Sequence, residues 1–555
     1  MPSAPRISGA ALRALARLAR TSGGAQTVYR ALRADLRAHE LSALPEGLRG
    51  ELLFSLTPAM ARPPRGTNDP ADLPVSEAGW AASAKKLGRA YARGTVSPTE
   101  ITTHCLRVAR ELAGRSPCMG PIHVYDDEHA LRDAALSTER HRRGAALGPL
   151  DGVPVAIKEQ VAVAHLPRRD GTDFLADTPM EDDATAVARL RAAGAIVLGL
   201  TPMTELGMSP LGQNRHRTMP RNPHALRHLA GGSSTGSGVA VGTGLVPIAV
   251  GCDGGGSIRI PAAWNGVFGI KPTWGRVSRG GALCGGSVSH VGPIAGSTHD
   301  LAIALACMAG HDALDPETLA APPLDLATLE AALRRGVRGL RIGIEEREWS
   351  DAAPAVERVG REALRILERE GAVLVPIRIE LARFTAGIGA LSIGPEGRAL
   401  NKRDIERSLD QMGEDLQISF AALSRVSSAE FLDAQRLRVG FRAELTHQFA
   451  DVDLLALPTT ADTAPAVSDA EMRSGFVDSR ALSRAVRYAF HGNLSGLPAG
   501  TAPVGVGDGG LPIGLQLIGD AWDEATVLAA LAHLERVGAA IPRRPAVAVD
   551  LLASR

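Results

Sequence analysis

The segment GGSSTGSGVAVGTGLVPIAVGCDGGGSIR, residues 231–259, holds two serine-bearing glycine loops separated by a short apolar run. Glycines beside a serine let the chain turn sharply, expose the hydroxyl and point successive N–H groups at one spot. An activated hydroxyl nucleophile with backbone donors for a developing oxyanion requires that arrangement. We therefore predict that Ser233 and Ser257, 24 residues apart, belong to one catalytic site.

The residues around these serines predict an α/β fold. Residues 239–244 are typical of a helix and 246–252 of a strand, so the second loop lies just beyond the C-terminal end of a strand. Ligand sites of open α/β sheets collect there. Residues 184–200 give helix, glycine and apolar strand in the same order, with Asp183 as the expected helix cap. This order predicts a large mixed, mainly parallel twisted sheet that is covered by helices on both faces.

The rest of the chain divides into four predicted parts. We expect an N-terminal helical extension and linker over residues 1–75, a catalytic domain over 76–540, a helical insertion at about 375–450 and a tail over 541–555. Capping boxes at Ser97/Glu100 and Ser427/Glu430 mark two helix starts. Further strands are expected at 153–158, 453–457 and 513–518, and a last helix at 524–536.

Residues 10–37 form a basic amphipathic pattern, with leucines among arginines and no acidic residue before Asp35. Three interpretations remain open for it: an outer helix packed on the main domain, contact with an anionic membrane surface, or an organelle-targeting segment. A secretory signal is disfavoured, because no continuous apolar region follows the basic residues.

Composition excludes several classes of function. The net charge of +1 and the low aromatic content of 3% argue against nucleic-acid binding. The five cysteines show neither CxxC spacing nor a paired-histidine pattern, which argues against disulfides and structural zinc and favours a reducing compartment. Without an apolar run of 18 residues, no spanning helix is expected. We expect a cytoplasmic protein, with membrane association as an open alternative, no metal or cofactor, and a homodimer as the default assembly.

A lone lysine, Lys158, ends the apolar stretch GVPVAIK at residues 152–158. Burial penalises the charged ammonium, so the pKa of such a lysine falls from about 10.4 toward neutrality and makes the amine a usable base. The alternative is a lysine that snorkels from a strand end.

Together these motifs resemble the amidase signature family, as do GIKPTWGRVS at 269–278, HVGPIA at 290–295 and GLPIGLQLIG at 510–519. The resemblance covers roughly residues 80–540 and implies a serine–cis-serine–lysine triad that hydrolyses amides. It implies Ser257 as nucleophile, Ser233 as bridging serine after a cis Gly232–Ser233 peptide, and Lys158 as base. It also implies that the oxyanion is held by the backbone N–H groups of Gly254, Gly255, Gly256 and Ser257.

Each neighbouring residue has an alternative interpretation. The sequence GSSTG at 232–236 fits a nucleophile elbow centred on Ser234, but residues 227–230 do not supply the preceding apolar strand, so Ser234 is expected to support the loop. Asp253 and Arg259 are expected to pin the glycine loop rather than to act in chemistry. Cys252 is expected to be an inert core thiol.

Within the family, the sequence most resembles the fatty acid amide hydrolase branch, in its plant-type and bacterial forms. The sequence DGGGS at 253–257, PTT at 458–460 before TAP at 463–465 and the N-terminal extension carry this resemblance. It implies long-chain acyl amides such as N-acylethanolamines as substrates, with Met203 and Met208 as pocket lining or, alternatively, as core residues.

Three other functions remain open. The first is a general or aryl amidase, the second the glutaminase subunit of a tRNA-dependent amidotransferase. The third, a non-catalytic binding module, is disfavoured because Lys158, Ser233 and Ser257 are all intact.

Overall fold

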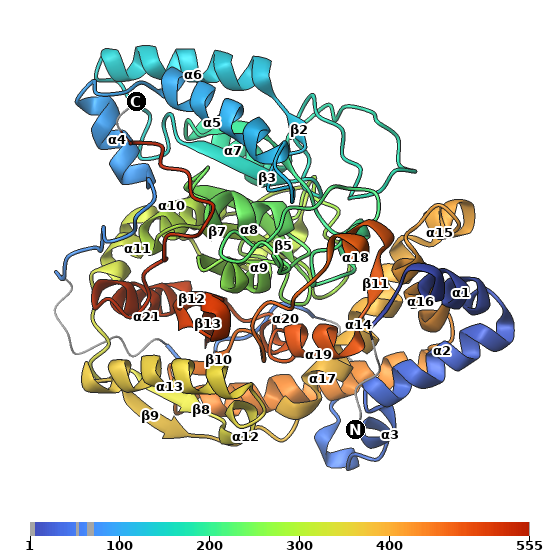
Figure 1. Ribbon diagram of the computed structural model, residues 1–555. Coiled ribbons are helices and arrows are strands. Elements are labelled where there is room, and N and C mark those ends of the chain that lie inside the picture. Colours follow the sequence, from blue (N-terminus) through green and yellow to red (C-terminus); the bar gives the residue numbers. More distant parts are fainter. Residues whose placement is uncertain (1–5, 52–54, 64–71, 554–555) are drawn as a thin grey trace.

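The computed structural model describes residues 6–51, 55–63 and 72–553. Within these ranges, eleven strands form one sheet in the order β2-β4-β3-β5-β7-β6-β12-β13-β10-β8-β9 (Figure 1). Their bounds are β2 (Val124–Tyr125), β3 (Pro154–Lys158), β4 (Ile196–Thr201), β5 (Ile248–Asp253), β6 (Phe268–Lys271), β7 (His290–Ala295), β8 (Arg341–Ile344), β9 (Val373–Pro376), β10 (Leu454–Pro458), β12 (Ala499–Val506) and β13 (Pro512–Gly519).

The sheet is mixed, as predicted, and its parallel pairs form two blocks. β4, β3 and β5 run parallel, as do β10, β8 and β9. Between the blocks, β5, β7, β6, β12, β13 and β10 pair antiparallel in that order. The parallel order expected from helix, glycine and strand repeats therefore applies to the blocks. The centre is antiparallel, and only β6–β7 and β12–β13 in it pair consecutive strands.

Helices surround the sheet (Figure 1). Those of the main domain are α4 (Ala84–Ala92), α5 (Pro98–Ala113), α6 (Asp127–Arg142), α7 (Thr185–Ala192), α8 (Thr235–Gly242), α9 (Arg259–Trp264), α10 (Thr298–Met308), α11 (Leu326–Leu333), α12 (Glu346–Trp349), α13 (Pro354–Arg369), α18 (Asp469–Ser474), α19 (Ser479–Val486), α20 (Phe490–Ser495) and α21 (Glu524–Arg536). The 3-10 helices are η1 (Glu46–Leu48), η2 (Glu205–Gly207), η3 (Pro316–Ala320), η4 (Ala382–Phe384) and η5 (Asp508–Gly510).

The predicted helix starts are confirmed at the two capping boxes and wrong at Asp183. Both boxes are formed, at the starts of α5 and of α17 (Ser428–Phe449). α7 begins at Thr185 after Ala184, whose side chain cannot cap. The Asp183 carboxylate instead accepts a hydrogen bond from the Ala164 N–H at 2.8 Å and pairs with Arg191 at 3.1 Å. The Asp183 carboxylate therefore binds these partners instead of capping α7.

Four helices fill the region expected as an insertion. They are α14 (Thr385–Leu400), α15 (Lys402–Ser408), α16 (Glu414–Leu423) and α17 (Ser428–Phe449). α14 packs on α17 and α20, which brings this layer against the end of the sheet that carries the serine loops. Ala434, Leu437, Phe441 and Leu445 form a buried face of α17.

The N-terminal pattern folds as two helices, α1 (Gly9–Ala19) and α2 (Ser22–Asp35), followed by α3 (Ala38–Ser42). Thr21 separates them because its hydroxyl accepts the Gly24 N–H at 3.0 Å and caps α2. Leu12, Ala16 and Ala19 pack with Ile418 of α16. The apolar stripe of α1 is therefore used against the main domain.

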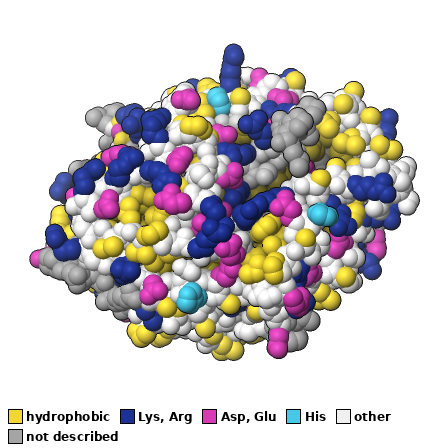
Figure 2. All heavy atoms as spheres, turned by 90° about the horizontal axis from the view of Figure 1, so that it is seen from below, with side chains coloured by type: hydrophobic (Ala, Val, Ile, Leu, Met, Phe, Trp, Pro, Cys, Tyr) yellow, Lys and Arg dark blue, Asp and Glu magenta, His cyan; other side chains and the backbone are white. Residues whose placement is uncertain are grey.

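The remaining segments also contact the main domain. Of the expected linker, residues 64–71 lie outside the described residues, while the Ala61 N–H donates to Asp520 at 2.8 Å. In the tail, the N–H of Val549 donates to Thr243 at 2.7 Å. No helix in the described ranges combines the length and apolarity needed to cross a membrane. On the face seen from below, basic and acidic side chains are interspersed with apolar patches (Figure 2).

Candidate active site

Lys158 and Ser233 meet at the ends of the first parallel block. Lys158 is the last residue of β3, and Ser233 lies two residues before α8. Lys158 Nζ and Ser233 Oγ are hydrogen bonded at 2.7 Å, and both side chains are buried. Because β3 and β5 are parallel neighbours, Lys158 emerges at the same edge as Asp253, the last residue of β5.

Burial lowers the pKa of Lys158 below the ordinary lysine value, because the ammonium form cannot be hydrated there. Neighbouring acidic groups oppose this shift with a smaller effect. A buried amine in its neutral form has a lone pair that accepts a hydroxyl proton. The hydrogen bond to Ser233 provides that hydroxyl.

The Gly232–Ser233 peptide is cis, as the family resemblance implied. The next residue, Ser234, is fully buried, and its hydroxyl donates to the Cys252 carbonyl at 3.2 Å. The Ser234 N–H donates to the Ser257 carbonyl at 3.3 Å. Ser234 thus ties the first serine loop to the second and to β5, in keeping with the supporting role expected for it.

The second serine lies in what we call the glycine loop, residues 253–257, between β5 and α9. Asp253 shapes this loop, because its carboxylate accepts the N–H groups of Gly256 at 2.7 Å and Ile258 at 3.2 Å. Ser257 is 8% exposed, and its hydroxyl makes no hydrogen bond to any residue that the structure describes. The hydroxyl is therefore available to a substrate.

Three of the four expected oxyanion donors are available. Within the described residues, the N–H groups of Gly254, Gly255 and Ser257 have no protein acceptor. The structure differs from the prediction at Gly256, whose N–H is held by Asp253. A carboxylate at a strand end captures the N–H three residues later, which the sequence pattern did not resolve.

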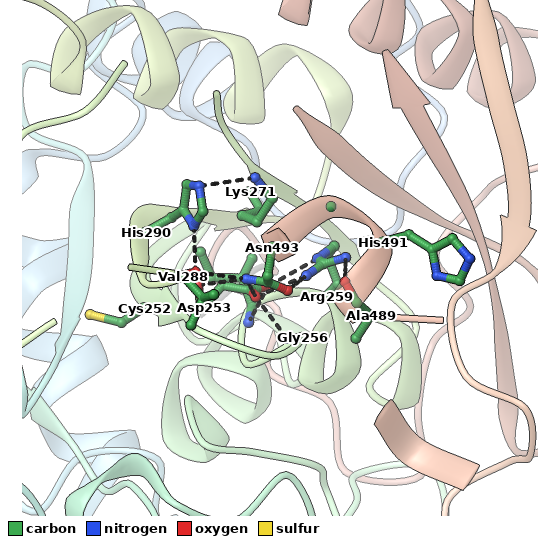
Figure 3. A network of polar contacts seen from close by, with 12 residues as sticks. Cys252, Asp253, Gly256, Arg259, Lys271, Val288, His290, Ala489, His491 and Asn493 are labelled. Carbon is green, nitrogen blue, oxygen red and sulfur yellow. Dashed lines mark hydrogen bonds and ion pairs between the residues drawn. The ribbon is translucent and has the colours of Figure 1, made fainter. Parts of the chain in front are cut away.

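Arg259 holds Asp253 from the other side, as predicted for a pinning pair. The two side chains are fully buried and joined by bonds of 2.9 and 3.0 Å (Figure 3). Burial alone would raise the pKa of Asp253, but the Arg259 guanidinium holds it well below its usual range. Asp253 is consequently ionised and fully hydrogen bonded.

Two polar residues in this network were missed at the sequence level. Asn493 of α20 contacts both Asp253 and Arg259 (Figure 3), and Gln516 of β13 accepts a hydrogen bond from Arg259. Asn493 lies 240 residues after Asp253, and Gln516 lies 257 residues after Arg259. α20 is a six-residue helix without amphipathic periodicity, so no local signal indicated Asn493.

Apolar side chains approach the glycine loop from α20 and α14. A Cβ atom added at Gly255 would lie 2.8 Å from the Phe490 ring, and one at Gly254 would lie 2.8 Å from Ile393 Cδ1 and 3.0 Å from Ser289 Oγ. Close packing therefore requires glycine at these two positions, whereas at Gly256 a φ of 102° also favours glycine. Phe490 and Ile393 form an apolar wall beside the expected oxyanion donors.

Met203 and Met208 have different environments. Met203 is fully buried, which fits the core interpretation. Met208 is half-buried and packs with residues of α15 and α16. α14 passes it closely, since a Cβ added at Gly397 would lie 3.3 Å from Met208 Sδ. A separate hollow of about 710 Å³ lies between α3, η1 and η4, away from the serines.

A second buried lysine, Lys271, ends β6. Lys271 Nζ donates to the Pro272 carbonyl at 2.8 Å and to His290 Nε2 at 3.2 Å, and His290 Nδ1 donates to the Val288 carbonyl at 2.9 Å (Figure 3). His290 thus makes local hydrogen bonds. Cys252 is buried in β5 and is not disulfide bonded.

A buried lysine with a lowered pKa bonded to a serine, a second serine whose hydroxyl makes no hydrogen bond to a described residue, and a loop of unused N–H donors are the parts of a serine-dependent amide hydrolase. Residues 109–528 match the family described as Amidase. The chain belongs to this family.

Relatives of known name cover most of the chain. It is 32% identical over 469 residues to a fatty acid amide hydrolase of Arabidopsis thaliana, covering 83% of this chain and 77% of the relative. It is 35% identical over 487 residues to a glutamyl-tRNA(Gln) amidotransferase subunit of Chloroflexus aggregans, covering 83% and 97%. A solved chain from a vestigial complex linked to the origins of an s-triazine catabolic enzyme superposes with a TM-score of 0.77 at 30% identity, covering 83% and 100%.

Proposed function

We propose that this amidase cleaves long-chain fatty acid amides such as N-acylethanolamines, through an acyl-enzyme on Ser257. Neutral Lys158 takes the Ser233 proton, Ser233 takes the Ser257 proton, and the Ser257 oxygen attacks the amide carbonyl. The proton returns by the same path to the leaving amine. Water then releases the fatty acid from Ser257.

The observation that carries this mechanism is the 2.7 Å hydrogen bond between Lys158 and Ser233, with burial lowering the pKa of the lysine. The free donors of Gly254, Gly255 and Ser257 would bind the oxyanion. In other acyl-transfer enzymes, one such donor contributes about 3–4 kcal/mol to lowering the barrier.

The fatty acyl assignment is supported by three observations. Phe490 and Ile393 provide an apolar wall beside the glycine loop. The plant relative carries the name fatty acid amide hydrolase, and α1 and α2 extend the chain before the matched family region.

Glutamine hydrolysis is the second candidate, because the amidotransferase subunit is 35% identical to this chain. The test is release of fatty acid from a long-chain N-acylethanolamine against release of ammonia from glutamine, with the Ser257→Ala variant as blank. Intact-protein mass after brief incubation identifies the acyl group on Ser257. A higher kcat/KM for glutamine would overturn the lipid assignment.

We also propose peripheral membrane contact through α1. Arg13 and Arg17 are exposed on this helix and Leu18 is half-exposed. Basic and apolar side chains at the surface together favour binding to anionic lipid. Sedimentation with phosphatidylglycerol vesicles should pull down the protein, whereas the Arg13→Glu/Arg17→Glu variant should stay in solution. Equal sedimentation of both proteins would refute the contact.

A further inference from the structure

We propose that Asn493 is a positioning residue that aims the Gly254 N–H at the oxyanion. The inference rests on the proposed function, in which the glycine loop stabilises a tetrahedral intermediate. Asn493 lies on α20, and its side chain is fully buried between the glycine loop and residue 288. It contacts the loop without touching either serine.

The carboxamide of Asn493 is fixed in one orientation. Its Nδ2 donates to the Asp253 carbonyl at 3.0 Å, to Asp253 Oδ1 at 2.9 Å and to the Val288 carbonyl at 3.0 Å. Its Oδ1 accepts a hydrogen bond from Arg259 Nη2 at 2.6 Å (Figure 3). Three oxygens lie around Nδ2 and a guanidinium lies beside Oδ1. If the amide were flipped, its oxygen would face the three oxygens and its NH2 group would face the guanidinium, so all four hydrogen bonds would be lost.

The bond to the Asp253 carbonyl controls a catalytic donor. The Asp253 C=O and the Gly254 N–H belong to one planar peptide, which is not among the cis bonds of the chain. In a trans peptide these two groups point in opposite directions. Holding the carbonyl toward α20 therefore directs the Gly254 N–H away from α20, and that N–H has no other partner among the described residues.

Further buried hydrogen bonds support Asn493. The Val288 carbonyl accepts hydrogen bonds from both Asn493 Nδ2 and His290 Nδ1, the second at 2.9 Å. His290 lies on β7 directly opposite Asp253 in the β5–β7 pair, and its Nε2 accepts Lys271 Nζ of β6. The amide therefore links the loop to two strands through a continuous buried chain of hydrogen bonds.

No other side chain of this size reproduces the pattern. Leucine has the same shape but removes the donors, which leaves the Asp253 and Val288 carbonyls without this partner. An aspartate would place a second carboxylate against Asp253 Oδ1 and two carbonyl oxygens, so it would donate only when protonated.

The test compares Asn493→Leu and Asn493→Asp with a matched control, Asn222→Leu. Asn222 is also fully buried, and its amide donates to two backbone carbonyls, those of Leu229 at 3.2 Å and Trp264 at 2.8 Å. Active sites are counted by complete labelling of Ser257 with a fluorophosphonate. Steady-state kinetics are then expressed per labelled site across pH.

For Asn493→Leu we expect kcat per labelled site to fall about 100-fold, the scale of losing one oxyanion donor, with KM within about threefold of wild type. Asn493→Asp should recover part of its kcat as pH is lowered, as its carboxyl regains a proton. Asn222→Leu should lower the melting temperature and leave kcat per site unchanged. Wild-type kcat in Asn493→Leu, or equal losses in the control, would overturn the inference.

A crystal structure of the wild-type phosphonate adduct tests the same inference without any variant. The Gly254 nitrogen should lie within hydrogen-bond distance of the phosphoryl oxygen while the Asn493 bonds persist. A phosphoryl oxygen held without Gly254 would count against the positioning role. A wild-type protein that is not labelled at Ser257 would instead refute the proposed function, so the two failures are distinguishable.

Discussion

Two buried lysines end strands of the same sheet, and only one is placed to act as a base. Lys158 ends β3 and Lys271 ends β6, and both side chains are fully buried. Burial lowers the pKa of each below the ordinary lysine value. Lys158 is bonded to the Ser233 hydroxyl, whereas Lys271 is bonded to the Pro272 carbonyl and to His290.

The partner, and not the burial, decides the chemistry. A hydroxyl has a proton to give to a neutral amine, and a carbonyl has none. The ring proton of His290 is directed to the Val288 carbonyl, so Lys271 meets only the acceptor nitrogen of that ring. A lowered lysine pKa is thus insufficient to assign a base, because structural lysines shift in the same direction.

The largest expected effect is that of Ser257→Ala. This variant tests whether Ser257 is the nucleophile that Lys158 activates through Ser233. Without the Ser257 hydroxyl no acyl-enzyme forms, and we expect kcat to fall by about 10⁵-fold or more, as for other serine nucleophiles. Intact-protein mass should show no acyl or phosphonate adduct. An adduct in this variant would move the nucleophile elsewhere, with Ser234 as the first alternative.

Next is Lys158→Met, which removes the amine but keeps an apolar chain of similar length. Loss of a general base costs about 10²–10⁴-fold, and the residual activity should rise toward alkaline pH as hydroxide replaces the base. In the wild type, activity should fall as pH drops and the lysine becomes protonated. Rates measured from pH 5 to 10 decide this, and wild-type activity in Lys158→Met would exclude it as the base.

Arg259→Met tests the buried charges between the two lysines. It leaves the Asp253 carboxylate buried and unpaired, which costs about 3–5 kcal/mol of unfolding free energy. Because the folded pKa of Asp253 is lowered, the stabilisation from this pair is complete above the unfolded value near 4 and is lost as pH falls below it. Urea unfolding at pH 7 measures the loss, and a change below about 1 kcal/mol would mean that the pair is replaceable.

The sequence allowed the chemical centre to be predicted because its residues lie in long local motifs. The local geometry of each motif follows from its residue types. An apolar strand ends at Lys158, and glycine-rich loops contain Ser233 and Ser257. Parallel β3 and β5 end at the same sheet edge, which places Lys158 at the edge that carries the glycine loop. The roles of these residues remain predictions that the variants test.

The surrounding shell could not be predicted, because it depends on long-range contacts. Asn493 reaches Asp253 across 240 residues, and Phe490 is placed against Gly255 from the same short helix. The antiparallel centre of the sheet likewise depends on which strands pair, and apolar runs alone do not encode direction. Asp183 shows the same limit, since a distant N–H replaced its expected helix cap.

The smallest expected effect on activity belongs to Lys271→Met, which sharpens the comparison with Lys158→Met. Both variants remove a lysine whose folded pKa is lowered. The pKa of such a lysine is lowered in the folded chain and is about 10.4 in the unfolded chain. Between these two values mainly the unfolded chain binds the proton, so the unfolding free energy rises with pH. Each methionine variant should therefore show a flatter rise of unfolding free energy between pH 7 and 10.

Activity should separate the two variants. Lys271 touches no serine, so kcat per labelled site in Lys271→Met should stay within about tenfold of wild type, with the shape of the pH–rate profile unchanged. The loss of its bonds to Pro272 and His290 costs about 1–3 kcal/mol of stability, which offsets the gain from removing a buried amine. If Lys271→Met instead gave the result expected for Lys158→Met, a large loss with residual activity that rises toward alkaline pH, the base would be shared between the two lysines, and the hydrogen-bond partner would not decide which lysine acts.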